Sequence, residues 1–202
     1  ARAGGRFVYE LGAFVGLLVV DTKQSTPEGG AASIQTVVQD QAGGAETRSC
    51  YTLVCDYPSL GGSASFVVGV TGFFGYAPAP SVGLGVRFLL GPRAGGGGLV
   101  AAGPSASFLL AERFRIGPAV LFGTASHVEQ DTVQLTTPTG FNGVDSPLHG
   151  TLGFSLGVGS ELGWTLFSNP TGSVVLQATP LYLYGSNGTS WSLPLGAAYH
   201  WN

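Results

Sequence analysis

The residues of this chain with the most scope for chemistry are four charged side chains set in otherwise apolar or glycine-rich segments. They are Glu10, Arg87, Arg115 and Glu161, two acids and two bases that lie far apart in the sequence. Each shares one face of its segment with small or polar residues, and Gln177 and His200 have similar surroundings. Charges removed from water are costly unless they are paired. The pattern therefore predicts a buried ionic network that plugs an interior and that Gln177 and His200 could join. The alternative for the same residues is a narrow gated pathway or a proton-sensitive plug.

A second group of reactive side chains lies in residues 126–149. Ser126, His127 and Glu129 are close in sequence, and His149 follows across the intervening segment. Nucleophilic catalysis needs a serine, a histidine and an acid within hydrogen-bond reach, and the two histidines with nearby acids could instead hold a metal ion. Loops rich in Ser, Thr and His produce such neighbours by chance, and no calcium-loop spacing occurs. We therefore assign the chain no catalytic residue, no metal ligand and no cofactor.

The chain contains two cysteines, Cys50 and Cys55. A pair without His or further Cys beside it is a poor metal site, and in an exported protein a local disulfide is expected. Export is also our interpretation of the first residue, because the chain begins at Ala1 and contains no Met, as after removal of a signal peptide. The loop that the disulfide would close is small, so its stabilising effect should be modest.

The composition is that of a protein with little surface in water. Of the 202 residues, 44% are hydrophobic and 9% are charged, whereas ordinary soluble domains carry roughly 25% charged residues. The longest apolar run, residues 13–20, is far short of the ~20 residues that a spanning helix needs. Lipid tolerates no unpaired backbone groups, so this combination favours a closed barrel. The net charge of -3 gives no electrostatic case for nucleic acid.

Alternation of apolar residues with small or polar residues predicts about eight strands that must position these side chains. They cover approximately residues 7–20, 63–76, 81–90, 102–110, 114–123, 153–166, 174–184 and 191–201. The apolar face of each is assigned to lipid and the other face to a barrel interior. Pro104, Pro118, Pro180 and Pro194 are assigned to the lipid face. Because proline removes a ladder hydrogen bond, each is expected at a bulge or near a strand end.

Long polar connections alternate with short turns between these strands. The long ones span residues 21–62 and about 126–147, and they contain eight acids: Asp21, Glu28, Asp40, Glu46, Asp56, Glu129, Asp131 and Asp145. Within the first loop, residues 33–38 could extend as a strand, and the cysteine pair could close a second short ribbon. Outer-membrane barrels carry long loops outside and short turns on the periplasmic side, so both loops are expected to be extracellular.

The chain ends on Gly196-Ala197-Ala198-Tyr199-His200-Trp201 and Asn202. The Gly-x-x-aromatic-x-aromatic pattern of Gly196, Tyr199 and Trp201 resembles the C-terminal insertion signal of bacterial outer-membrane barrels, although Pro194 and the trailing Asn202 depart from it. With the repeated alternation, the whole chain, residues 1–202, resembles the small OmpA/OmpX-type barrels. The resemblance implies one eight-stranded antiparallel up-and-down transmembrane barrel with both termini in the periplasm. It also implies insertion by the barrel assembly machinery into outer-membrane lipid and lipopolysaccharide.

This resemblance does not imply one activity, because function on a common fold depends on the site. We expect a non-enzymatic outer-membrane protein with a structural or surface-interaction role, whose long loops bind a protein or surface partner. A narrow channel for small or apolar solutes is the first alternative. A lipid-modifying enzyme that uses Ser, His and an acid is the second. At the level of fold, the alternative is a soluble lipocalin-like barrel, which would need a polar exterior.

Overall fold

The computed structural model describes residues 5–22, 25–27, 35–39, 45–49, 60–136 and 142–201. Side chains at positions 23–62 and 129–149 are not described. Cys50 and Cys55, with the predicted disulfide, therefore lie outside the described residues. Across the described ranges, no helix is long and apolar enough to cross a membrane.

The described secondary structure consists of thirteen strand segments. They are β1 (Arg6–Thr22), β2 (Ser25–Pro27), β3 (Gln35–Gln39), β4 (Ala45–Ser49), β5 (Leu60–Ala79), β6 (Val82–Pro92), β7 (Gly97–Leu110), β8 (Phe114–Thr136), β9 (Asn142–Thr151), β10 (Ser155–Asn169), β11 (Gly172–Ala178), β12 (Leu181–Gly185) and β13 (Gly188–Trp201).

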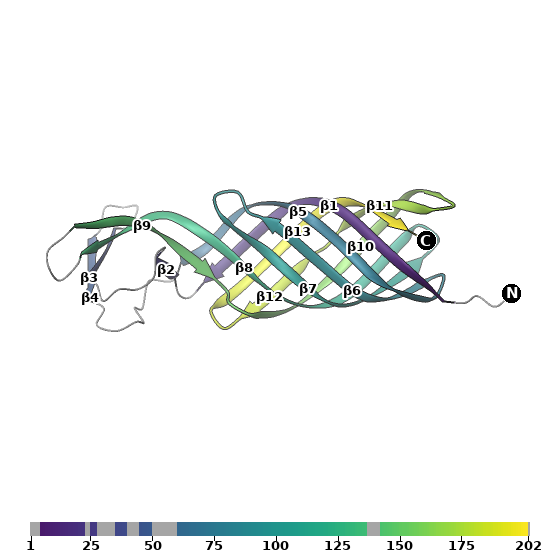
Figure 1. The fold of residues 1–202 in the computed structure, drawn as a ribbon, viewed down its shortest axis with the longest axis horizontal. Helices are drawn as coiled ribbons and strands as arrows, with labels where there is room; N and C mark the ends of the chain where they lie inside the picture. The colour runs from purple at the N-terminus through teal and green to yellow at the C-terminus, as the bar shows by residue number, and fades with distance from the viewer. Residues whose placement is uncertain are drawn as a thin grey trace.

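Eight strand positions pair edge to edge and close into a ring (Figure 1). The order around the ring is β1, β5, β6, β7, β8, β10, then β11 with β12 in one position, and finally β13. β13 pairs back onto β1, from Tyr9 opposite Trp201 to Thr22 opposite Gly188. Every pairing is antiparallel. The predicted eight-stranded antiparallel barrel is confirmed.

Side chains of the ring strands alternate between an apolar outer face and the interior. On β1, Leu11 and Val15 are both 52% exposed, whereas Val8 and Phe14 are 3% and 4% exposed. Large exposed apolar side chains occur on every ring position, among them Phe66, Leu84, Val100, Phe122, Leu156, Trp164, Leu176, Tyr184 and Trp191. Such an outer face suits lipid rather than water. The predicted direction of the faces is therefore confirmed, and the soluble lipocalin-like alternative is wrong.

The prolines sit differently from the expectation. Pro180 lies in a break between β11 and β12, which together form one strand position of the ring. The two segments keep the same register against β13, with Ala178 opposite Leu195 and Leu181 opposite Ser192. Pro118 and Pro194 stand neither at a bulge nor at a strand end, so that expectation is wrong for them: each lies inside a continuous ladder on one side, and the ladder on its other side has no pair at its position.

Pro194 is also buried, which places it on the interior face rather than on the lipid face. Its carbonyl accepts a 2.8 Å hydrogen bond from the Thr179 amide. The backbone of Pro194 thus faces the break between β11 and β12. The ladder has no regular hydrogen bond there, so the N–H that proline lacks is not missed.

At the end away from both termini, strands continue beyond the ring (Figure 1). The loop predicted for residues 126–147 is wrong in its extent, because β8 runs to Thr136 and β9 returns from Asn142 as its antiparallel partner. β3 pairs with β8 and β4, and β2 pairs with β9. β3 overlaps residues 33–38, which the sequence predicted could extend. We call β2, β3, β4, β9 and the outer part of β8 the loop-end ribbon.

The interior has two layers of different character. Toward the loop-end ribbon it holds an apolar cluster of buried side chains, which includes Phe14, Leu18, Val67, Leu89, Leu99, Leu121, Leu152 and Leu183. Toward the termini it holds the charged residues Glu10, Arg87, Arg115 and Glu161, all at most 9% exposed. An eight-stranded barrel is only wide enough for its own side chains to fill. Besides these two layers, the interior holds a small apolar cluster of Val8, Phe73 and Ala77 at the terminal end and buried Thr22, Arg93 and His127 at the other end.

Candidate functional site in the barrel interior

Four ring strands bring the predicted charges to one level of the interior: Glu10 comes from β1, Arg87 from β6, Arg115 from β8 and Glu161 from β10. Glycine on the neighbouring strand makes this possible. Gly117 lies opposite Glu161 in the β8–β10 ladder, and a Cβ atom there would be 3.2 Å from Glu161 Oε2. The missing side chain leaves the space that the carboxylate occupies.

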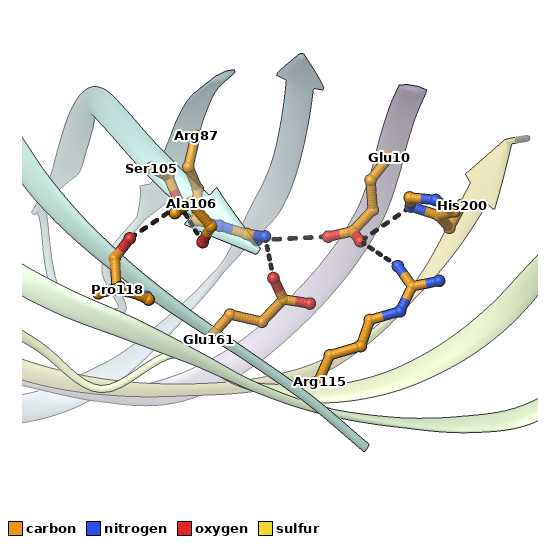
Figure 2. Close-up of polar contacts among 8 residues, drawn as sticks. All are labelled: Glu10, Arg87, Ser105, Ala106, Arg115, Pro118, Glu161 and His200. Atoms are coloured by element: carbon orange, nitrogen blue, oxygen red, sulfur yellow. Dashed lines mark hydrogen bonds and ion pairs between the residues drawn. The ribbon is translucent and has the colours of Figure 1, made fainter. Parts of the chain in front are cut away.

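Arg87 is the centre of the network. Its Nη1 lies 3.3 Å from Glu10 Oε1, and its Nη2 donates to Glu161 Oε2. Figure 2 shows both carboxylates turned toward this one guanidinium. Arg87 and Glu161 are 0% exposed, and the Phe73 ring lies 5.6 Å from the guanidinium carbon. Two buried anions thus share one buried cation, in the geometry of a charge-assisted pair.

Arg115 and His200 approach the same Glu10 from the terminal side (Figure 2). Arg115 Nη1 is 3.7 Å and His200 Nδ1 is 3.6 Å from Glu10 Oε2. Arg115 Nη2 also donates to the Ser173 hydroxyl at 3.4 Å. These contacts are longer than those of Arg87, so Arg115 is the less tightly held of the two guanidiniums.

Several buried polar atoms around this network have no hydrogen-bond partner within the described part of the chain. They are Arg87 Nε, Arg115 Nε, Glu161 Oε1, both amide atoms of Gln177, and Thr165 Oγ1. Buried polar groups without partners are costly, and ordered water usually satisfies them. The level of the network is therefore a polar layer that favours water, unlike the apolar cluster above it.

The structure brings together the four charges that the sequence singled out, together with His200, which the sequence predicted could join them. Gln177 lies on β11 at the same depth, opposite Gly163 and Gly196 in its two ladders. Sequence reasoning missed Phe73, Ser173 and Thr165. These three residues lie at inward-facing positions of their strands, and this position was the one sequence signal that could have identified them. Many other residues of the chain also lie at inward-facing positions, so the signal does not single them out.

Ser126 and His127 do not form a catalytic pair. His127 is fully buried on the interior face, and neither ring nitrogen has a hydrogen-bond partner among the described residues. Ser126, the next residue along β8, points to the opposite face, as alternation requires. The side chains of Glu129 and His149 lie outside the described residues. A hydroxyl and an imidazole on opposite faces of one strand cannot act as a nucleophile and its base.

The terminal aromatic residues belong to the outer rim of the ring at the end of β13. Tyr199 and Trp201 stack edge to face at 4.8 Å, and the Tyr199 hydroxyl lies 3.1 Å from that of Thr171 in the neighbouring turn. Gly196 lies against Ala13, whose carbonyl would be 2.1 Å from a Cβ atom at that position. Gly196 is thus explained by close approach of β1, and its part in an insertion signal stays a prediction.

Comparisons with known proteins return structural likenesses. No protein-family model and no curated protein match the chain. Neisserial surface protein A is 13% identical, with 98% of each chain covered and a TM-score of 0.46. The attachment invasion locus protein Ail of Yersinia pestis is 14% identical over 95% of this chain and 97% of that chain, with a TM-score of 0.44. The outer membrane protease OmpT from Escherichia coli is 9% identical over 96% of each chain, with a TM-score of 0.37.

The assignment of the fold rests on the strand pairing and the apolar outer face. A closed antiparallel barrel with an even number of strands, an apolar outer face and a polar network inside is the architecture of bacterial outer-membrane proteins. The fold implied by the resemblance to small outer-membrane barrels is confirmed, and this architecture places the chain in a bacterial outer membrane.

Proposed function

We propose that this chain is a closed, non-conducting outer-membrane anchor that presents the loop-end ribbon as a contact surface for a protein or another surface. The observation that carries the proposal is the filled interior. At the level of the network, Arg87 and Glu161 are 0% exposed, and in the apolar layer Leu18, Leu121 and Leu183 are also 0% exposed. A barrel that its own side chains fill in this way works as a scaffold rather than as a pore.

Two observations weaken the alternatives. A channel for small or apolar solutes would have to pass the layer between β1, β6, β8 and β12, which Leu18, Leu121 and Leu183 fill with fully buried side chains. A lipid-modifying enzyme that paired Ser126 with His127 would need both side chains on one face of β8, and they point to opposite faces.

The loop-end ribbon supports the contact role. β8 and β9 extend past the ring, and β3 and β2 add to their two edges. Strand pairing thus ties β2 and β3 to the strands of the barrel wall. Exposed elements on rigid scaffolds commonly carry binding function. We place the termini in the periplasm and the ribbon at the cell surface, because outer-membrane barrels carry their longer loops outside.

Planar-bilayer recording tests the closed anchor. The purified full chain should insert and show no stable conductance at moderate voltage, because no water path crosses the apolar layer. Large and stable single-channel currents from the unmodified chain would contradict the proposal and favour the channel.

Deletion of residues 25–56 tests the contact role. The deletion removes β2, β3 and β4 but leaves every ring strand intact, so the variant should still fold, as shown by heat-modifiable gel migration. Cells that display the full chain should aggregate or adhere to surfaces more than cells that display the deletion variant. A Gly-Ser replacement of equal length is the matched control and should behave like the deletion. Equal adherence of all three would remove the contact role.

A further inference from the structure

The bore of the barrel is hollow at the end that carries the termini. A cavity of about 150 Å³ opens there, enclosed by residues from β1, β5, β6, β7, β8, β10, β11 and β13. Its lining includes Arg6, Arg115, Thr165, Ser173 and His200. We call this cavity the terminal vestibule. It lies directly below the charge network, on the side away from the apolar cluster.

Arg115 lines the vestibule with several of its donors unmatched. The residue is 9% exposed, yet its contacts are one 3.4 Å hydrogen bond to Ser173 and one 3.7 Å approach to Glu10. Its Nε has no partner among the described residues. A guanidinium offers five donors in a fixed fork that matches an oxyanion. A buried arginine with most of its donors unmatched is therefore ready for an anionic ligand.

The charge network holds Arg115 only loosely. Arg87 contacts both Glu10 and Glu161 at close range and balances one of their two negative charges. Arg115 and His200 approach Glu10 only at 3.7 Å and 3.6 Å. Arg6 lines the mouth and adds a second guanidinium, while Glu112 on the rim adds one carboxylate. The lining of the vestibule thus holds two guanidiniums and one carboxylate.

Hydroxyl groups complete the lining. Thr165 is 6% exposed and its Oγ1 has no partner among the described residues, while Ser173 is 3% exposed and faces Arg115. Hydroxyls beside a guanidinium are the usual donors to phosphate and carboxylate oxygens. A site in which a few polar groups converge on one small cavity is the general form of a ligand site.

We propose that the terminal vestibule binds a small soluble oxyanion, a phosphate or a carboxylate, with Arg115 as its anchor and Thr165 and Ser173 as additional donors. The ligand enters along the bore from the aqueous side at the termini, because the lining residues face the interior and not the lipid. The apolar cluster above the network stops it from passing through, so the vestibule is a binding site and not part of a pathway. This site is independent of the loop-end ribbon.

Titration of inorganic phosphate and of acetate into the full chain, refolded in phosphate-free detergent micelles, tests the proposal. The side-chain Nε–H resonance of Arg115 should shift saturably with one or both anions. Arg113 lies exposed in the adjacent turn outside the lining, so its resonance in the same spectrum is the internal control and should not shift. Sodium chloride at matched ionic strength should leave both resonances in place.

Substitutions then assign the donors. Thr165→Val keeps the side-chain volume and removes the unpartnered hydroxyl, and it should weaken phosphate binding roughly tenfold, as loss of a hydrogen bond to a charged group does. Thr71→Val is the matched control, because Thr71 is 1% exposed and its hydroxyl also lacks a partner among the described residues, but it does not line the vestibule. Thr71→Val should leave the affinity unchanged.

Arg115→Gln should abolish the saturable shift of the remaining vestibule resonances, such as those of His200. If Arg115→Gln fails to fold by heat-modifiable migration, the Thr165→Val and Thr71→Val pair still decides the question. The proposal is overturned by the absence of a saturable shift, by an equal shift with chloride, or by equal affinities of Thr165→Val and Thr71→Val.

Discussion

Replacement of Glu161 by Gln isolates the energetic role of the charge network. The change keeps the side-chain volume, so it creates no cavity against Gly117 and Gly163, and it removes one negative charge. The four residues Glu10, Arg87, Arg115 and Glu161 then change from neutral to a net positive charge, and Arg87 retains its 3.3 Å pair with Glu10 alone. Both Arg87 and Glu161 are 0% exposed. Breaking such a buried pair costs about 3–5 kcal/mol, and because Glu10 remains, we expect about 3 kcal/mol.

The assay is reversible urea unfolding in phospholipid vesicles, followed by the fluorescence of Trp164, Trp191 and Trp201, which lie on β10 and β13. Arg87→Gln combined with Glu161→Gln restores neutrality, so the double variant should recover a coupling energy of roughly 1.5 kcal/mol or more relative to the two single variants. The reasoning is refuted if Glu161→Gln lies within about 0.5 kcal/mol of the unmodified chain and the two changes are additive. The network would then be solvated and would not clamp the strands.

Three further predictions concern the outer face, the apolar layer and the cysteines. Leu156→Arg should cost about 2–4 kcal/mol if it lies near the bilayer midplane, and a spin label at position 156 should report lipid, whereas a report of water would contradict the membrane assignment. The double variant Leu18→Ser/Leu121→Ser should admit water to the apolar layer and produce measurable conductance, whereas the outer-face control Leu193→Ser should not. A double variant without conductance would show that another layer closes the bore. Cys50 and Cys55 should be oxidised to one disulfide, seen as an intact mass lower by two hydrogen atoms, and two free thiols would refute this.

The faces and the number of strands were predictable because strand alternation has a strict period of two. A shift of one residue would move every side chain from the lipid face to the interior face or the reverse. The run from Phe7 to Val19 can therefore face lipid with its apolar residues in only one orientation. The same logic placed Glu10, Arg87, Arg115 and Glu161 inside before their contacts were seen. The bore of an eight-stranded barrel is narrow, so four charged side chains that face inward are expected to pair with each other.

The parts that could not be predicted depend on neighbours across the sheet. Residues 126–147 are polar, and polarity alone indicates a loop, but pairing between β8 and β9 carries the strands on to Thr136 and Asn142. The interior face of Pro194 follows from alternation with the exposed Leu193 and Leu195. Its position inside a ladder could not be predicted, because the compensating interruption at Pro180 lies on another strand. The terminal vestibule could not be predicted from the sequence for the same reason, because residues from eight ring positions line it.

The separation of the interior into an apolar layer and a polar layer links these observations. The unpartnered atoms of Gln177, Thr165 and Glu161 favour water, and the nearest opening is the terminal vestibule, because the apolar cluster around Leu18 and Leu121 excludes water from the other end. Water and solutes therefore reach the charge network from one side of the membrane. A ligand in the vestibule and a partner on the loop-end ribbon are separated by a dry, close-packed layer.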